Sequence, residues 1–250
     1  INDCSMGVQG ACSEIRINGQ SVSLDQAHHL RVNDRIELFN NTHGAILYLA
    51  MAGGFTATEV LGSTATDIAN GLGGLNGLPF TSKDILKGSK FNMPRHTRSI
   101  PEGLSSRRYF SKNVTVHVIA GPEAYLFTKE VIDNFYSHAF LLSAEISRVG
   151  YRLTGYPIHA DSYNIPSKTV LPGTIQIPPS GDPIILMADG PVTGGYPRMG
   201  VVARVDQPIL AQLRSGGRVR FLACLPEEAR LREANQRQWI EELYHKKTER

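Results

Sequence analysis

The segment 187–200, MADGPVTGGYPRMG, places polar and glycine residues between two apolar stretches. A turn alone needs about four residues, so most of this segment is available for another role. Asp189 ends the first apolar stretch, and the return begins with Thr193, Gly194, Gly195, Tyr196, Pro197 and Arg198. Paired glycines can expose backbone N–H groups as a concavity that binds anions. The pattern therefore predicts either an anion-binding turn or a plain long hairpin.

Two arginines flank a glycine and a tyrosine in SRVGYRLTG, residues 147–155. On a strand, alternate side chains share one face, so Arg148 and Arg152 are expected to point the same way. Two cations on one face are either solvated or directed at an anion. Tyr151, between them, is a candidate for the wall of a pocket.

A single amide interrupts the apolar residues of PGTIQIPPSG, residues 172–181. Gln176 lies between Ile175 and Ile177, and neighbouring side chains on a strand point to opposite faces. The amide is therefore either exposed at the surface or directed into a barrel or a site, where it can bind a ligand.

Consecutive glycines also occur in residues 50–67, from AMAGGF to LGSTATD. Glycine allows a turn with positive φ or a close approach of the backbone to another group. Ser63 and Asp67 follow as candidate substrate-binding residues. The alternative is a tight corner with an Asx turn, in which Asp67 bonds its own backbone.

Short apolar or alternating stretches bounded by turn residues predict a mainly β protein with two β-rich lobes. Asn18-Gly19 indicates a hairpin, whereas residues 1–13 are expected to be a loose lead-in. The later strands are short and regularly spaced, which is typical of a barrel or sandwich. Strands are expected in residues 13–19, 35–39, 45–55, 113–121, 150–155, 173–179, 183–189, 200–205 and 217–222.

Two longer stretches have helical periodicity. In residues 121–137, Pro122 and Glu123 are expected to begin a helix whose apolar residues recur three to four apart. Pro226, followed by two glutamates, predicts a helix from there to Arg250, and residues 207–213 predict a short one. The expected organisation is a lobe at 1–105, a barrel lobe at 106–225 and a C-terminal amphipathic helix at 226–250, with the boundary in the Arg-rich connector 93–112.

Composition and motifs argue against several classes of protein. A net charge of +3 with dispersed basic residues argues against a nucleic-acid partner. The sequence has no apolar stretch of the ~18 residues that a membrane span requires. Three cysteines without C-x-x-C spacing suit reduced thiols in the cytoplasm. The sequence contains neither a metal-ligand motif nor a G-x-x-x-x-G-K-[ST] loop, so no metal is expected and ATP binding by this chain alone is unsupported.

Taken together, these motifs resemble one family. YLAMAGGF, VLGSTATD and GLGG, followed by SRVGYRLTG and PGTIQIPPSGDPIILMADGPVTGGYPRMGVV, are similar to the allophanate hydrolase subunit 2 family. That family includes KipA-type proteins, the C-type subunit of the ATP-dependent 5-oxoprolinase and the carboxyltransferase domain of urea carboxylase. The resemblance extends over most of residues 15–225.

The resemblance implies a cyclophilin-like β-barrel architecture without isomerase activity. It also implies a KipI-like subunit 1 partner and a third subunit, which together use ATP to open 5-oxoproline to L-glutamate. Two alternatives follow from the same family. A KipA-type protein is a regulatory binding protein without catalysis, and a carboxyltransferase would use biotin and act on urea or another amide.

The sequence departs from the family pattern in two places. Family members begin with a segment carrying a TTVQD-G-R-G pattern, which this sequence lacks. We therefore expect the chain to begin inside the family's length and its activity to depend on more than this chain. GPVTGGYP also stands in place of the usual RQTTGGYP, so a positive charge is missing before the turn.

A common chemical requirement assigns roles to the candidates. Carboxyl transfer and phosphorylation of an amide both need negative charge stabilised on the amide oxygen, which preorganised donors provide. We expect Arg148 and the N–H groups of Gly194 and Gly195 to face this oxygen. Asp189 or Gln176 would take or orient the amide N–H. The remaining candidates, which would contact the substrate and exclude water, are Tyr151, Thr193, Tyr196, Ser63 and Asp67.

Overall fold

The computed structural model describes residues 3–40, 44–89 and 110–245. The chain divides into two compact units, one of residues 1–42 and 47–107 and one of residues 43–46 and 108–250. Each unit contains a hydrophobic core of its own. Most of the predicted connector 93–112 lies outside the described residues.

Two three-stranded antiparallel sheets form the body of unit 1, with strand orders β4-β1-β6 and β3-β2-β5. Buried side chains from both sheets share one core, which is why the sheets pack together. The strands are β1 (Cys4–Gly10), β2 (Cys12–Ile17), β3 (Gln20–Val22), β4 (Ala27–Leu30), β5 (Ile36–Asn40) and β6 (Leu47–Met51).

Of two predictions for unit 1, the hairpin is confirmed and the loose lead-in is wrong. Asn18 and Gly19 join β2 to β3 with φ angles of 52° and 79°, which confirms the hairpin. The prediction of a loose lead-in at residues 1–13 is wrong, because β1 occupies its centre. Met6 and Val8 fill alternate positions on the buried face of β1, and β4 and β6 satisfy its backbone on either side.

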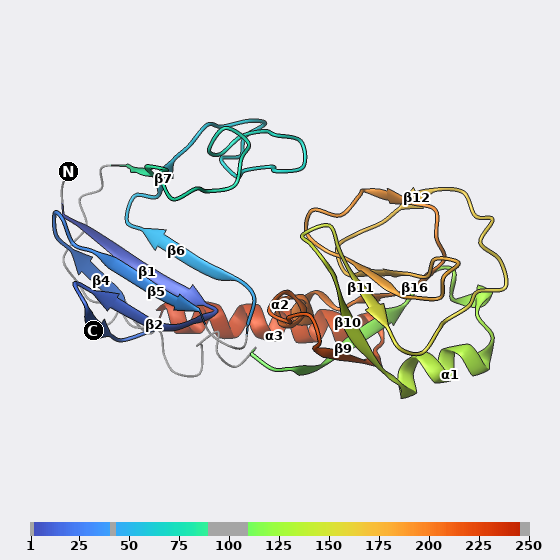
Figure 1. Cartoon of the computed structure of the whole chain (residues 1–250). Helices are drawn as coiled ribbons and strands as arrows, with labels where there is room; N and C mark the ends of the chain where they lie inside the picture. Colours follow the sequence, from blue (N-terminus) through green and yellow to red (C-terminus); the bar gives the residue numbers. More distant parts are fainter. Residues whose placement is uncertain (1–2, 41–43, 90–109, 246–250) are drawn as a thin grey trace. The chain divides into compact units, whose positions relative to one another are not determined.

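Residues 55–88 of unit 1 form a long excursion, which we call the arm. It is closed at its base by the two short strands β7 (Phe55–Thr56) and β8 (Lys87–Gly88). Between them the chain makes turns without a helix or a long strand, seen as the teal loops beyond β7 in Figure 1.

Unit 2 is built on a closed barrel of strands in the order β10-β11-β14-β13-β16-β9-β17. β17 pairs with β10 and, in parallel, with β9, and so closes the circle. A two-stranded ribbon of β12 (Lys168–Thr169) and β15 (Thr193–Gly194) accompanies it. The barrel strands are β9 (Asn113–Ala120), β10 (Ala139–Ile146), β11 (Gly150–Thr154), β13 (Thr174–Gln176), β14 (Ile184–Leu186), β16 (Arg198–Val202) and β17 (Arg218–Ala223).

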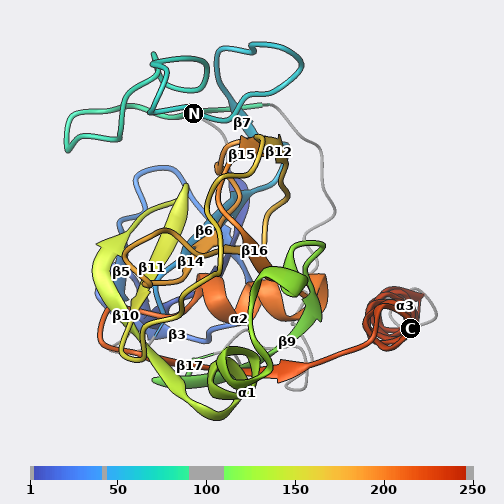
Figure 2. The ribbon, with the colours of Figure 1, turned by 90° about the vertical axis from the view of Figure 1, so that its right-hand side faces the viewer.

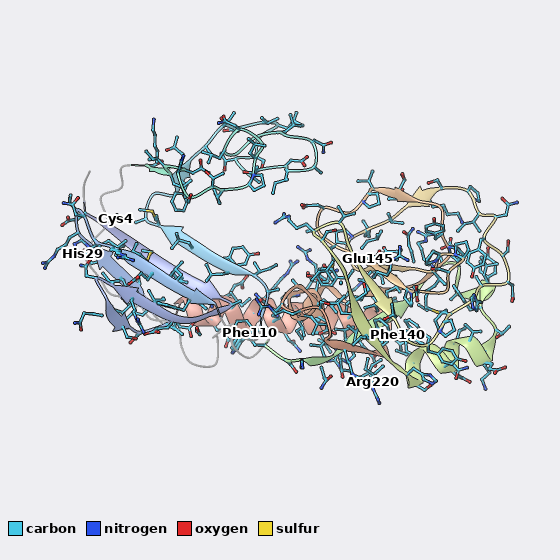
Figure 3. The ribbon with its side chains drawn as sticks, viewed as in Figure 1. Cys4, His29, Phe110, Phe140, Glu145 and Arg220 are labelled. Carbon is cyan, nitrogen blue, oxygen red and sulfur yellow. The ribbon has the colours of Figure 1, made fainter. Side chains whose placement is uncertain are left out.

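The interior of the barrel is apolar, because alternate residues of each strand point inward. Phe140 and Phe221 are fully buried there with Phe135, whose ring stacks on that of Phe221 at 4.5 Å between centroids. Figure 3 labels Phe140 on β10 and the exposed Arg220 on β17, the strand that pairs with β10. The mainly β barrel expected from the sequence is thus observed.

The helices of unit 2 agree with the sequence except at one point. α2 (Gln207–Ala211) and α3 (Pro226–His245) begin where they were predicted, whereas the predicted helix at residues 121–137 does not begin at Pro122. A 3₁₀ turn at Ala124–Leu126 comes first, followed by α1 (Lys129–Ser137). The side chain of Thr128 accepts a hydrogen bond from the Val131 N–H and caps α1. α1 packs against β17, beside which Figure 2 shows it.

Candidate functional site

The end of β13 carries an unsatisfied polar group. Gln176 is only 5% exposed, and its amide nitrogen has no hydrogen-bond partner among the residues that the structure describes. A buried donor left unpaired destabilises a protein by about 1–3 kcal/mol. Such an atom is therefore suited to an acceptor brought by a ligand. The structure shows that the amide is buried and not exposed at the surface.

Gly194 on β15 leaves room for this amide. A Cβ at Gly194 would collide with the Gln176 amide nitrogen, whereas a Cβ at Gly195 would meet nothing within 4 Å. Neither glycine has a positive φ, so the pair does not supply the left-handed residue of an anion-binding nest. The glycine at 194 is explained by close approach to Gln176 rather than by a sharp turn.

A buried carboxylate with two cations lies beside Gln176. Gln176 pairs with Arg198 across β13 and β16. Arg198 donates from Nε and Nη2 to the two carboxylate oxygens of Glu123, at 2.5 Å and 2.7 Å, and Lys168 Nζ donates to Glu123 Oε1 at 3.1 Å. Arg198 Nη1 also donates to the carbonyl of Thr169 on β12. These bonds attach the β12-β15 ribbon to the barrel.

The charges of this cluster do not cancel. The hydrogen bonds from Arg198, together with Lys168, lower the pKa of the fully buried Glu123 to about 2. One carboxylate therefore faces two cations at neutral pH. The Lys168 side chain remains 47% exposed, so the excess positive charge is accessible from solvent. The Gln176 donor and this charge together favour a ligand with a carbonyl oxygen that gains negative charge.

Arg148 and Asp189 pair with each other instead of joining Gln176. Arg148 lies in the turn between β10 and β11, not on the predicted strand. Its Nε and Nη2 donate to the two carboxylate oxygens of Asp189, at 2.5 Å and 3.0 Å, with the side chains 73% and 46% exposed. Gln176 pairs with Ile184 at the start of β14, whereas Asp189 follows the end of that strand. The register thus places them toward opposite ends of β14.

Three other candidates in unit 2 lie in different environments. Tyr151 is in the hydrophobic core, with its hydroxyl 3.5 Å from the carbonyl of Ala211, and burial raises its pKa. It does not form the wall of the Gln176 site in the described structure. Thr193 and Tyr196 are exposed and flank Gly194 and Gly195, so they share the segment that covers Gln176.

Ser63 and Asp67 lie in the arm of unit 1 and bond to their own loop. Ser63 Oγ accepts from the N–H of Ala65. Asp67 accepts from the backbone N–H and the side-chain amide of Asn70, at 3.1 Å and 2.7 Å, and these bonds lower its pKa. This is the Asx turn that the sequence left open as the alternative.

Glu123, Lys168 and Arg198 were not among the residues predicted for the site. Arg198 belongs to the glycine-rich segment 187–200, and the sequence indicated it as part of the return without giving it a role in the site. Glu123 was assigned to the start of a helix. Its partners are 45 and 75 residues away along the chain, and no local pattern connects them.

A cavity of about 810 Å³ occurs elsewhere in unit 2. It lies between α2, the loop at residues 171–173 and the first turns of α3, and its lining is mostly apolar. None of the ten predicted site residues lines it.

Two further properties concern the residues that the structure describes. Within them, no three histidine, cysteine or acidic side chains gather closely enough to hold a metal ion. No helix in the same residues has both the length and the apolar character needed to cross a lipid bilayer.

The chain belongs to the family described as "Carboxyltransferase domain, subdomain A and B", whose model matches residues 2–223. It is 32% identical to the C-type 5-oxoprolinase subunit of Escherichia coli and 29% identical to that of Haemophilus influenzae. Each match covers 94% of this chain and 74% of the relative.

A solved structure shares the fold. The urea carboxylase of Kluyveromyces lactis matches with a TM-score of 0.84 and 23% identity, over 97% of this chain. This chain corresponds to only 23% of that longer chain. The family match and the bacterial relatives confirm the family resemblance stated from the motifs. The relatives are named as 5-oxoprolinase subunits and, in Lachancea kluyveri, as a urea amidolyase.

Proposed function

We propose that this protein is the C-type subunit of an ATP-dependent 5-oxoprolinase, which activates the cyclic amide of 5-oxoproline for hydrolysis to L-glutamate. The bacterial relatives, at 32% and 29% identity over most of the chain, support this choice. The structural observation that carries it is the buried amide nitrogen of Gln176, which finds no partner in residues 3–40, 44–89 and 110–245. An amide oxygen of a substrate is the kind of acceptor that this donor lacks.

In this proposal the substrate's amide oxygen accepts a hydrogen bond from Gln176, with Gly194 providing the space between the ribbon and the barrel. Lys168 supplies positive charge toward the oxygen as negative charge develops on it. Glu123 and Arg198 hold Lys168 and the ribbon in position. One preorganised donor of this kind contributes about 3–4 kcal/mol to transition-state stabilisation.

ATP is assigned to the partner subunits. The sequence has no G-x-x-x-x-G-K-[ST] loop, and the glycines beside Gln176 lack the backbone conformation of a phosphate-binding nest. We therefore propose a KipI-like subunit 1 protein and a third oxoprolinase subunit as partners. All three cysteines are free thiols, which suits work in the cytoplasm.

Reconstitution tests the proposal. The chain is mixed with its KipI-like homologue and the third subunit, ATP is added, and phosphate and glutamate are measured with and without 5-oxoproline. We expect phosphate and glutamate to be released only when every component is present. A complex in which 5-oxoproline stimulates neither product would reject the oxoprolinase and favour a KipA-type regulatory binding protein.

A biotin-dependent carboxyltransferase is the second candidate. The family description and the fold of the K. lactis urea carboxylase favour it. It needs the same stabilised amide oxygen, with the amide nitrogen as the nucleophile. Transfer of a carboxyl group from carboxybiotin to urea or another amide, measured on the same preparation, distinguishes it from the oxoprolinase.

A further inference from the structure

The arm of unit 1, residues 55–88, exposes apolar side chains and buries almost none. Seven large apolar side chains on it are between 43% and 99% exposed. The only buried residues of the arm are Gly73, Gly74 and Gly77, which have no side chain. The seven exposed residues are Leu61, Ile68, Leu72, Leu78, Phe80, Ile85 and Leu86.

Backbone hydrogen bonds, not a core, organise the arm. Reciprocal N–H to carbonyl pairs join Thr58 to Gly74, Val60 to Ser63 and Asp67 to Leu72. The N–H of Gly77 donates to the carbonyl of Gly73, and a Cβ at Gly73 would meet the carbonyl oxygen of Ala65 at 2.6 Å. The arm therefore has a specified conformation although it lacks apolar packing of its own.

That conformation directs apolar groups outward. Leu61 has a φ of 52° and is 99% exposed. The left-handed region disfavours a leucine by roughly 1–2 kcal/mol relative to the right-handed one. Leu61 thus has an unfavourable backbone conformation and a side chain in solvent. Neither feature stabilises the arm itself.

The number of exposed apolar side chains on the arm favours a protein partner. Each of the seven is at least 43% exposed. Fully burying such a side chain contributes about 1.5–3 kcal/mol, so a partner that covers several of them gains a large part of its binding free energy there. The arm carries few charges, namely Glu59, Asp67, Lys83, Asp84 and Lys87, so the complementary surface is apolar and weakly charged.

We propose that the arm is the docking surface for the apolar face of a separate companion subunit. The choice of a companion over a second copy of this chain rests on the proposed function, because the bacterial relatives are named as subunits. The arm and the Gln176 site consist of different residues, so the two can be altered independently.

The test uses the full chain and the KipI-like protein. Phe80→Gln combined with Ile85→Gln removes two side chains that are 68% and 80% exposed. Leu231→Gln, at a residue of α3 that is 63% exposed, is the matched control outside the arm. Titration calorimetry should give a dissociation constant at least tenfold higher for the double variant and an unchanged one for the control. Hydrogen exchange of residues 55–88 should slow when the partner is bound.

Four outcomes would overturn the inference. In the first, the double variant binds the partner as tightly as wild type does, and in the second, wild type forms no complex. In the third, wild type is a dimer whereas the double variant is a monomer. In the fourth, the double variant without the partner unfolds at a lower midpoint than wild type. The last would mean that the arm is covered from within the chain. Glutamate release by the wild-type mixture is measured separately. If the double variant binds more weakly but the wild-type mixture releases no glutamate, only the proposed oxoprolinase function is rejected. If glutamate is released but the double variant binds as wild type does, only the docking surface is rejected.

Discussion

Gln176 has a buried amide nitrogen that makes no hydrogen bond within the described part of the chain. A residue kept for stability would be expected to satisfy this donor or to be replaced by an apolar side chain of similar size. Proteins retain unfavourable groups where they serve a function. Stability and activity should therefore respond in opposite directions at this residue.

Gln176→Leu tests this expectation. Removing the unpaired donor should leave the free energy of unfolding unchanged or raise it, by up to about 1–3 kcal/mol. Substrate-dependent turnover of the assembled complex should fall by roughly 10²-fold, since one donor to the developing charge is lost. Urea denaturation and glutamate release measure the two effects. A less stable variant with wild-type turnover would make Gln176 a structural residue.

Glu123 makes stability depend on pH. Its pKa is lowered from 4.5 to about 2 by Arg198 and Lys168. A lowered carboxyl pKa contributes stability that is fully present above the unfolded value and is lost as pH falls through the folded value. We expect wild type to lose on the order of 3 kcal/mol between about pH 4.5 and pH 2 through this group.

Glu123→Gln should lose stability at pH 7 and flatten that dependence. Breaking a buried pair by removing one partner destabilises a protein by about 3–5 kcal/mol. Denaturant unfolding of the variant and wild type, repeated from pH 7 to pH 2, measures the difference. Parallel curves at all pH values would show that Glu123 is not the group responsible.

At the level of secondary structure, local patterns identified what neighbours along the chain determine. Asn18-Gly19 specifies its hairpin, and Pro226 with the following glutamates specifies the start of α3, because the residues involved are adjacent. β10 was missed, and Glu123 was assigned to a helix. Strand pairing and the Glu123 contacts depend on residues far along the chain, which a single sequence does not reveal.

Arg148 illustrates the same limit. Its place near Arg152 in the sequence suggested a shared strand face, but a turn carries it to Asp189. We expect Arg148→Ala to change the free energy of unfolding by less than about 1 kcal/mol, because exposed ion pairs contribute little. Turnover should stay within about twofold of wild type, because Arg148 pairs away from Gln176. If turnover fell by orders of magnitude, Arg148 would contact the substrate's amide oxygen, as the sequence alone suggested.

For the whole molecule, the relevant fact is that two hydrophobic cores are separate. Ile15 is fully buried in the core of unit 1, whereas Phe221 is fully buried in the barrel of unit 2. Units with their own cores can unfold as separate cooperative transitions. A substitution in one core should then affect the hydrogen exchange of that unit alone.

Ile15→Ala tests whether the two units unfold separately. Truncating a buried isoleucine destabilises its unit by about 2–5 kcal/mol. Hydrogen exchange followed by mass spectrometry at increasing urea should show earlier opening of β1–β6 and an unchanged midpoint for the barrel strands. Phe221→Ala provides the reciprocal control, with the barrel opening first. If either substitution shifted both sets of strands equally, the two units would form one cooperative unit, and the Gln176 site would depend on the integrity of unit 1.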